Sequence, residues 1–328
     1  MALTERVFVA GHRGLVGSAL VRAMERAGYA PPITRTRNEL NLLDAAAVGR
    51  FFAVERPAAV LLAAARVGGI GANDSARWDF LYENLVIQSN VLQSALATDV
   101  GRVVFFGSSC IYPKEAPQPI TEDSLLTGPL EPTNEPYAIA KIAGIKLVES
   151  AVRQFGKKWV SLMPTNLYGP GDNFDLETAH VLAALIRKFH DARASQLSRD
   201  RRAVVTLWGT GAPRREFLHA DDLARAALLM LENDATGLFN VGSGSDLRVD
   251  ELALLVARVS GYDGPIEWDS TRPDGTLAKL IDSSRIRRFG WTPSMPLEQG
   301  VRAVYDWYAR GAAANTLRSD ALQPSPDG

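Results

Sequence analysis

The chain has 328 residues, 46% hydrophobic and 22% charged, which is typical of folded proteins and suits one large α/β domain or two lobes. This composition excludes a fibre, a disordered protein and a membrane bundle, and no apolar run approaches the ~18 residues of a membrane span. The net charge of −1 gives no indication of nucleic-acid or membrane binding. The single cysteine, Cys110, and the absence of a secretory-signal pattern favour a reducing cytoplasm.

Short apolar runs alternate with helical periodicity through the first half of the chain. We expect strands at 6–10, 59–64, 102–106 and 159–164, and helices at 18–27, 80–97 and 135–154. Continuous apolar strands separated by helices indicate βαβ units and a parallel sheet covered on both faces. The sequence therefore predicts an α/β fold whose first domain, residues 1–170, is a doubly wound Rossmann sheet.

The chain changes character after Pro170, where helices alternate with isolated strands and Gly/Pro turns. We expect helices at 178–190, 221–232 and 250–259. Residues 171–311 are predicted to form mainly a smaller mixed α/β substrate lobe, with some segments returning to the Rossmann domain. The polar stretch 191–202, with its four arginines, is interpreted as a solvated loop, with a phosphate contact as the alternative, and 312–328 as a disordered tail.

A glycine-rich turn and several arginines indicate a phosphorylated dinucleotide. The three glycines within residues 11–17 are three apart and follow the first strand, where they would allow close approach to a pyrophosphate. The next helix offers free N–H groups to phosphates at its N-terminus. Arg13, Arg35 and Arg37 bring two or three guanidiniums to the place of a 2′-phosphate, so the sequence favours NADPH.

A serine and a Tyr-x-x-x-Lys pair predict carbonyl chemistry. Ser108 follows the strand expected at 102–106, and Tyr137 and Lys141 share one face of the helix expected at 135–154. A lysine ammonium favours the phenolate and would lower the pKa of the tyrosine. The serine hydroxyl could bind the same carbonyl oxygen as the tyrosine.

With these motifs the chain resembles the extended short-chain dehydrogenase/reductases, and within them the enzymes that act on GDP-4-keto-6-deoxy-D-mannose. The resemblance covers about residues 5–310, and its most specific segments are 11–17, 107–114, 134–147, 164–169, 215–219 and 273–276. It implies NADPH-dependent epimerisation at C3 and C5 with reduction at C4, and no metal. It also implies a homodimer in which the helices expected at 80–97 and 135–154 form a four-helix bundle.

The resemblance also assigns roles to individual residues. It implies that Cys110 and His180 together form the acid–base pair of the epimerisations, without assigning which residue serves which face, and that Ser108, Tyr137 and Lys141 act on the ketone. The implied substrate-binding residues are Lys188, Trp208, Arg215, Asp274 and Lys279, with Lys188 standing where an arginine is usual. The implied cofactor-binding residues are Gly11, His12, Arg13, Gly14, Leu15, Val16, Gly17, Arg37, Asn38, Glu39, Leu40, Asn41, Leu42, Phe106, Gly107, Ser108, Ser109, Lys141, Pro164, Thr165, Asn166, Leu167 and His180.

Alternative hypotheses stay open on the same scaffold. A nucleotide-sugar 4,6-dehydratase would need an acidic pair where this chain has Ser109 and Cys110, and a 4-epimerase would recycle NAD, which the arginines disfavour. A catalytically silent NADPH sensor would not need to keep Tyr137 and Lys141. Among the other histidines, His12 is expected to position backbone, His219 to begin a helix and His190 to face solvent.

Overall fold

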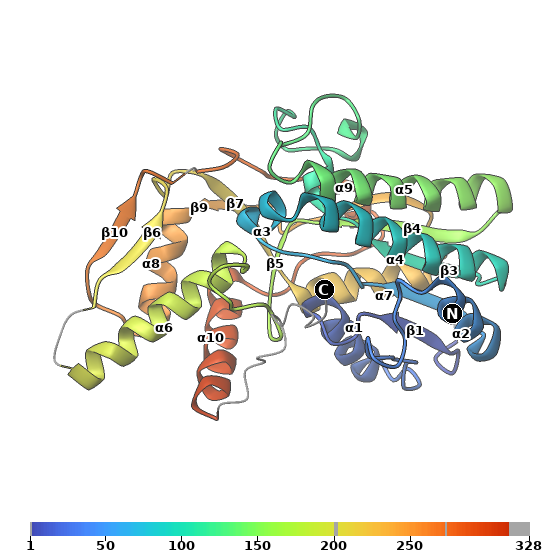
Figure 1. The fold of residues 1–328 in the computed structure, drawn as a ribbon, viewed down its shortest axis with the longest axis horizontal. Helices are drawn as coiled ribbons and strands as arrows, with labels where there is room; N and C mark the ends of the chain where they lie inside the picture. The colour runs from blue at the N-terminus through green and yellow to red at the C-terminus, as the bar shows by residue number, and fades with distance from the viewer. Residues whose placement is uncertain (1, 200–202, 273, 315–328) are drawn as a thin grey trace.

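The computed structural model describes residues 2–199, 203–272 and 274–314 (Figure 1). A five-stranded parallel sheet has the order β1-β2-β3-β4-β8 and consists of β1 (Val7–Ala10), β2 (Ala59–Leu62), β3 (Arg102–Phe106), β4 (Lys158–Pro164) and β8 (Gly237–Val241). Ile33 forms a parallel bridge with Phe8 on the other side of β1. The chain therefore passes from β1 to Ile33 on one side and later to β2 on the other, so the strand order reverses at β1. Open α/β sheets bind ligands at such a switch point.

Helices cover both faces of this sheet because successive β1 side chains point to opposite sides. Val7 and Val9 belong to one buried cluster, with helices α1 (Leu15–Arg26) and α7 (Ala220–Glu232). Phe8 and Ala10 belong to another, whose helices are α2 (Ala45–Glu55), α4 (Arg77–Ala97) and α5 (Glu135–Phe155). The short helix α3 (Ile70–Ser75) precedes α4. Figure 1 shows α4 and α5 side by side, and α1 packs against α7.

A second body packs beside the carboxyl ends of the strands, on the left in Figure 1. It contains the parallel pair β6 (Val205–Trp208) and β10 (Ile266–Asp269), and a sheet of β5 (Asn166–Tyr168), β7 (Arg214–His219) and β9 (Asp246–Arg248). Its helices are α6 (Val181–Arg199), α8 (Val249–Ser260) and α10 (Leu297–Ala313), whereas the short helix α9 (Ser284–Arg287) packs against β8 of the parallel sheet. A third buried cluster joins α6, α8 and α10 to these strands.

The predicted parallel α/β fold is confirmed, and the elements expected in the first half are present with bounds that differ by three residues or fewer. Helices α2 and α3 were not predicted. The strand expected before Thr34 is reduced to the single bridge at Ile33. In the described parts of the chain no helix is long and apolar enough to span a membrane.

Two expectations for the second half were wrong. The stretch predicted as a solvated loop continues α6 to Arg199, because Ala, Arg, Gln and Leu favour helices and Ala192 is buried; residues 200–202 lie outside the described residues. His190 is half-buried against the rings of Tyr305 and Tyr308, not solvated. The tail expected at 312–328 stays a prediction, because α10 ends at Ala313 and 315–328 lie outside the described residues.

Candidate active site

The turn after β1 has the shape that a pyrophosphate requires. Gly11 has a φ of +83°, and a Cβ there would lie 2.8 Å from the Ala64 backbone. A Cβ at Gly17 would lie 2.0 Å from the Gly11 carbonyl oxygen. Gly14 begins α1 without a side-chain cap, so no capping side chain occupies the N–H groups of the first turn. The glycines predicted from the sequence therefore fit a dinucleotide phosphate at the helix N-terminus.

The arginines predicted for the 2′-phosphate differ in their availability. Arg35 donates to Glu55 Oε1 at 2.5 Å and to the Thr34 carbonyl at 2.7 Å, and it lies over a phenylalanine ring. Arg35 is thus part of the packing, whereas Arg13 and Arg37 are exposed. The Glu39 carboxylate accepts the Thr36 N–H at 2.7 Å, and this bond lowers its pKa.

Lys141 lies at the centre of the site, at the carboxyl end of β3. Its Nζ donates to the Phe106 carbonyl at 2.9 Å and lies 5.6 Å from the centre of the Tyr137 ring. The side chain is buried, and burial lowers the pKa of Lys141 to about 8. The ammonium therefore stands beside the phenol as the Tyr-x-x-x-Lys spacing predicts.

Tyr137 differs from the prediction in its acidity. Its ring packs edge-on against Phe80, with centroids 6.3 Å apart. Burial, and secondarily the charge of Cys110, raise the pKa of Tyr137 above its usual value, whereas the sequence predicted a pKa lowered by Lys141. The phenol keeps its proton and can donate it.

Cys110 lies in a tight turn at the end of β3. Ser108 precedes this turn, and its Oγ accepts the Cys110 N–H at 3.4 Å. Burial raises the pKa of the thiol, while the charges of Lys279 and Lys141 and a hydrogen bond with Ser108 oppose this rise. The structure therefore brings the predicted thiol, hydroxyl and ammonium groups into one place.

His180 approaches from the other body, at the start of α6. Its carbonyl accepts the Ala184 N–H at 3.0 Å, which begins the helix. Part of the His180 side chain is exposed to solvent. The protein around the ring still removes much of its hydration, and this desolvation lowers the pKa of His180. The ring is therefore neutral near pH 7 and able to accept a proton.

The five predicted substrate residues line the second body. Arg215 donates to the Thr276 carbonyl at 2.6 Å, and burial lowers its pKa while Asp274 opposes this. Asp274 accepts from the backbone and hydroxyl of Thr210, each at 2.7 Å. Burial lowers the pKa of Lys279, and the charge of Arg215 lowers it further. These residues form one charged group.

Trp208 and Lys188 form the outer part of this region. Trp208 is 59% exposed, and its ring lies 5.7 Å from Lys188 Nζ and 5.0 Å from the Arg272 guanidinium. Lys188 Nζ also donates to the Thr206 carbonyl at 2.8 Å. An exposed ring between two cations can stack on a planar group. Sequence reasoning missed Arg272, for which no motif gave a signal.

Two further residues of the site were also missed. Phe80 supports Tyr137, but on the sequence it is one apolar residue among many on α4. Asp172 follows the Gly-Pro-Gly turn after β5, and burial raises its pKa to about 7, against a hydrogen bond from the Asn173 N–H at 2.8 Å. Only the position of Asp172 after a turn could have signalled it.

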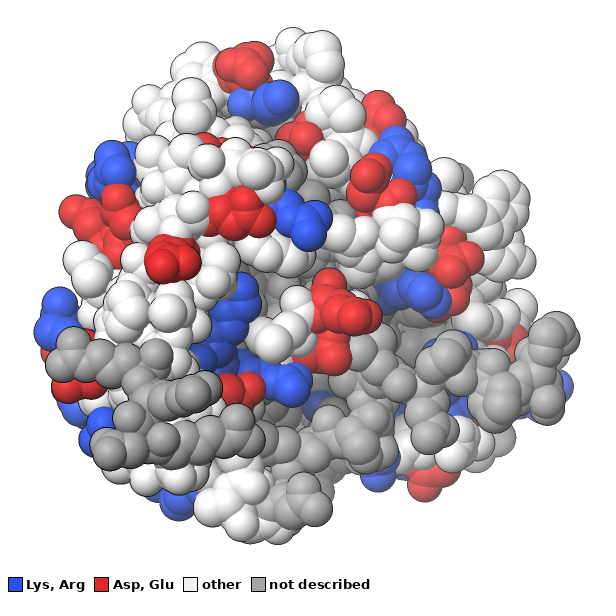
Figure 2. Space-filling view, turned by 60° about the vertical axis from the view of Figure 1, so that its left-hand side comes forward, with Lys and Arg blue, Asp and Glu red and all other residues white. Residues whose placement is uncertain are grey.

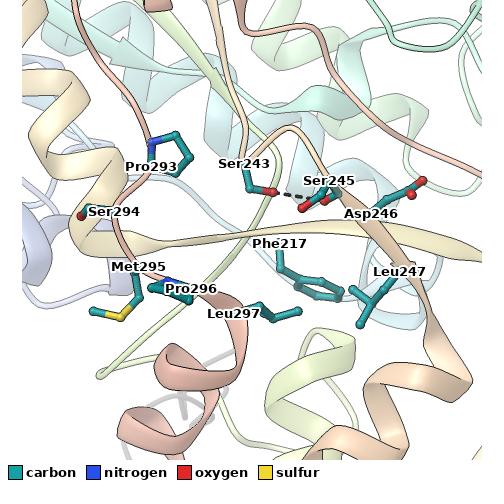
Figure 3. Close-up of a pocket in the computed structure, with 10 residues that line it drawn as sticks. All are labelled: Phe217, Ser243, Ser245, Asp246, Leu247, Pro293, Ser294, Met295, Pro296 and Leu297. Atoms are coloured by element: carbon teal, nitrogen blue, oxygen red, sulfur yellow. Dashed lines mark hydrogen bonds between the residues drawn. The ribbon is translucent and has the colours of Figure 1, made fainter.

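Other surfaces are distinct from this site. Figure 3 shows a hollow of about 280 Å³ lined by Phe217, Ser243, 245–247 and 293–297, which include none of the predicted site residues. On the face shown in Figure 2, basic and acidic side chains are interspersed.

Known proteins share this arrangement. The family model described as NAD dependent epimerase/dehydratase family matches residues 7–242. The chain is 54% identical to the probable GDP-L-fucose synthase 1 of Oryza sativa subsp. japonica, over 92% of each chain. It is 51% identical to the GDP-L-fucose synthase of Escherichia coli (strain K12), over 93% of this chain and 96% of that one.

A solved structure has a similar fold over nearly the whole chain. The GDP-mannoheptose C4 reductase of Campylobacter jejuni with NADP bound superposes with a TM-score of 0.87 at 36% identity, over 94% of this chain and 99% of that one. Sequence identity of this level over nearly the whole chain, on the same fold, shows the family. The chain belongs to the NAD dependent epimerase/dehydratase family and, within it, to the GDP-L-fucose synthases.

Proposed function

We propose that this protein converts GDP-4-keto-6-deoxy-D-mannose to GDP-L-fucose with NADPH, by epimerisation at C3 and C5 and reduction at C4. The observation that carries this is the Cys110 thiol beside Ser108, in the field of Lys141 and Lys279. A ketone reductase needs a serine, a tyrosine and a lysine. The additional thiol and the His180 imidazole supply the acid and base that epimerisation requires.

The epimerisations use the acidity that the C4 ketone confers on the neighbouring C–H bonds. Removing the proton from C3 or C5 places negative charge on the C4 oxygen, where the hydroxyls of Ser108 and Tyr137 stabilise it. The raised pKa of Cys110 leaves a thiol that can donate a proton, and the lowered pKa of His180 leaves an imidazole that can accept one. Donation to the face opposite to abstraction inverts the carbon.

The reduction uses the residues at the end of β3 and the start of α5. Bound NADPH supplies a hydride to C4. Tyr137 donates its proton to the C4 oxygen, and the Lys141 ammonium, 5.6 Å from the ring centre, stabilises the phenolate that is left. Residues 11–17 would bind the cofactor pyrophosphate, and Arg13 and Arg37 its 2′-phosphate.

The charged group on the second body fits the nucleotide part of the substrate. Arg215 and Lys279 would neutralise the diphosphate, Trp208 would cover a planar face of the ligand, and Asp274 holds the turn between them. Lys188 keeps a positive charge but lacks the fork of a guanidinium, so its contact would be a single point charge.

Exposed apolar side chains on α4 and α5 support a homodimer through these helices. Trp78 and Tyr82 stack with centroids 5.8 Å apart and are 73% and 52% exposed, and Ile139, Leu147 and Phe155 on α5 are also exposed. Large exposed apolar surface is typical of interaction sites. We infer that two copies pack these helices as a four-helix bundle, and we assign the enzyme to the cytoplasm because its one cysteine is unpaired.

The test is NADPH oxidation with GDP-4-keto-6-deoxy-D-mannose as substrate, followed by identification of the product. We expect wild-type protein to produce GDP-L-fucose, and Cys110→Ser to give a sugar that is reduced at C4 with incomplete inversion. Wild-type protein that leaves NADPH unoxidised would refute the substrate assignment. A fully inverted product from Cys110→Ser would refute the role of the thiol.

A further inference from the structure

We propose that Gly69 and Asn73 are positioning residues that hold the His180 segment in place, and that epimerisation depends on this contact more than reduction does. The inference rests on the role of His180 in the proposed function. Gly69 follows β2 in the Rossmann sheet, whereas His180 begins α6 in the other body. The contact between them therefore sets where the imidazole lies relative to Cys110 and Tyr137.

The contact is direct and leaves no space for a side chain. The Gly69 N–H donates to the Thr178 carbonyl at 2.9 Å. A Cβ at Gly69 would lie 2.8 Å from the Ala179 carbonyl oxygen and 3.4 Å from that of Thr178. These carbonyls belong to the two residues that precede His180. Any other residue at position 69 would push the His180 segment away.

The Gly69 side of the contact is fixed by a buried amide. Asn73 is 5% exposed, and its Nδ2 donates to the carbonyls of Gly68 at 2.7 Å and Gly69 at 3.0 Å. Its own N–H donates to the Gly69 carbonyl at 3.0 Å. Three hydrogen bonds from one residue therefore hold the two glycines in a single conformation.

The His180 side is equally ordered. The Asp175 Oδ1 accepts from the backbone N–H and the hydroxyl of Thr178, each at 3.1 Å, and the Asp175 carbonyl accepts the Ala179 N–H at 2.7 Å. Asn173 Nδ2 donates to the Thr178 hydroxyl at 2.8 Å. Because these hydrogen bonds fix the turn at 173–179, a displacement of Thr178 also moves His180.

The same loop also contacts the support of Tyr137. A Cβ at Gly68 would lie 3.1 Å from Cζ of Phe80, whose ring packs against Tyr137. The adjacent glycines, just before α3, thus let the backbone lie against Phe80 on one side and against the Thr178–Ala179 segment on the other.

The test compares Gly69→Ala with Gly71→Ala, a matched control two residues further on. A Cβ at Gly71 meets nothing within 4 Å. The chain has four histidines, so the imidazole resonance of His180 can be assigned by its loss in His180→Asn. In Gly69→Ala we expect this resonance to shift and the pKa of His180 to rise towards its ordinary value. In Gly71→Ala it should match wild type.

The second measurement separates the two half-reactions. In D₂O without NADPH, exchange of the C3 and C5 protons of GDP-4-keto-6-deoxy-D-mannose reports the acid and base alone. We expect Gly69→Ala to slow exchange by about 100-fold, the cost of misplacing a catalytic group by about 1 Å. C4 reduction of the uninverted sugar should continue, with the KM for NADPH unchanged. A purely structural defect would lower both reactions together.

The outcomes distinguish the positioning role from the function on which it rests. If the resonance and the exchange rate of Gly69→Ala match those of Gly71→Ala, the positioning role is refuted. If the resonance shifts while exchange persists, the contact is real and the catalytic role of His180 fails. If Gly69→Ala does not fold, Asn73→Ala removes the two side-chain hydrogen bonds to the carbonyls of Gly68 and Gly69 without a clash, and a smaller shift in the same direction is expected.

Discussion

Replacing Asp172 by asparagine should stabilise the protein at alkaline pH and leave it unchanged in acid. Burial raises the pKa of this carboxyl from 3.8 to about 7. Between these values the folded state holds a proton that the unfolded state has released, so stability falls as pH rises through the window. Three units at about 1.36 kcal/mol each give a loss of about 4 kcal/mol above pH 7. That is a large part of the about 5–15 kcal/mol that holds a typical domain together.

The asparagine keeps the acceptor for the Asn173 N–H but carries no charge. We therefore expect Asp172→Asn to gain up to about 4 kcal/mol of unfolding free energy at pH 8 and nothing at pH 4, measured by urea denaturation. Asp306→Asn, at an exposed position on α10, is the control and should change stability little at either pH. Equal stability of wild type and Asp172→Asn at pH 8 would refute the assignment of a buried, strained carboxyl.

Three further predictions follow from the site. Gly17→Ala, whose Cβ would meet the Gly11 carbonyl at 2.0 Å, should weaken NADPH binding at least about tenfold in a fluorescence titration, while Gly49→Ala, with nothing within 4 Å, should bind as wild type. The kcat/KM of reduction should fall as pH rises past about 8, because the Lys141 ammonium then loses its proton; a rate that stays level to pH 10 would contradict this role. Trp78→Glu with Tyr82→Glu should give monomers in analytical ultracentrifugation, and an unchanged dimer would place the interface elsewhere.

The sequence predicts most of the Rossmann half because its signals are local. A short continuous apolar run such as Ala59–Leu62, between helical segments, is typical of a strand buried on both faces, and the glycine loop is specified by steric limits at single positions. Lys141 and Tyr137 come together because a helix places residues four apart on one face. Such features depend on a few neighbouring residues, which the sequence displays directly.

The errors share a different cause, which is competition between distant groups. Arg35 was expected to face a phosphate, but Glu55, twenty residues along, and the Phe51 ring take its guanidinium. The segment 191–199 is polar enough for a loop, yet burial of Ala192 keeps it helical. The acidity of Tyr137 depends on how much protein surrounds it, and no spacing of residues gives that quantity.

The two proposed half-reactions draw on different parts of the fold. Reduction uses residues at the end of β3 and the start of α5, which belong to one rigid sheet and its covering helix. The proposed epimerisation also uses His180, which the chain reaches only after leaving the sheet. Proton transfer requires the imidazole to lie within a narrow range of distances from the substrate. A side chain on the second body is held in that range only by a contact that joins the two bodies. The close approach of Gly69 to Ala179 is such a contact, because it sets one position by backbone atoms alone.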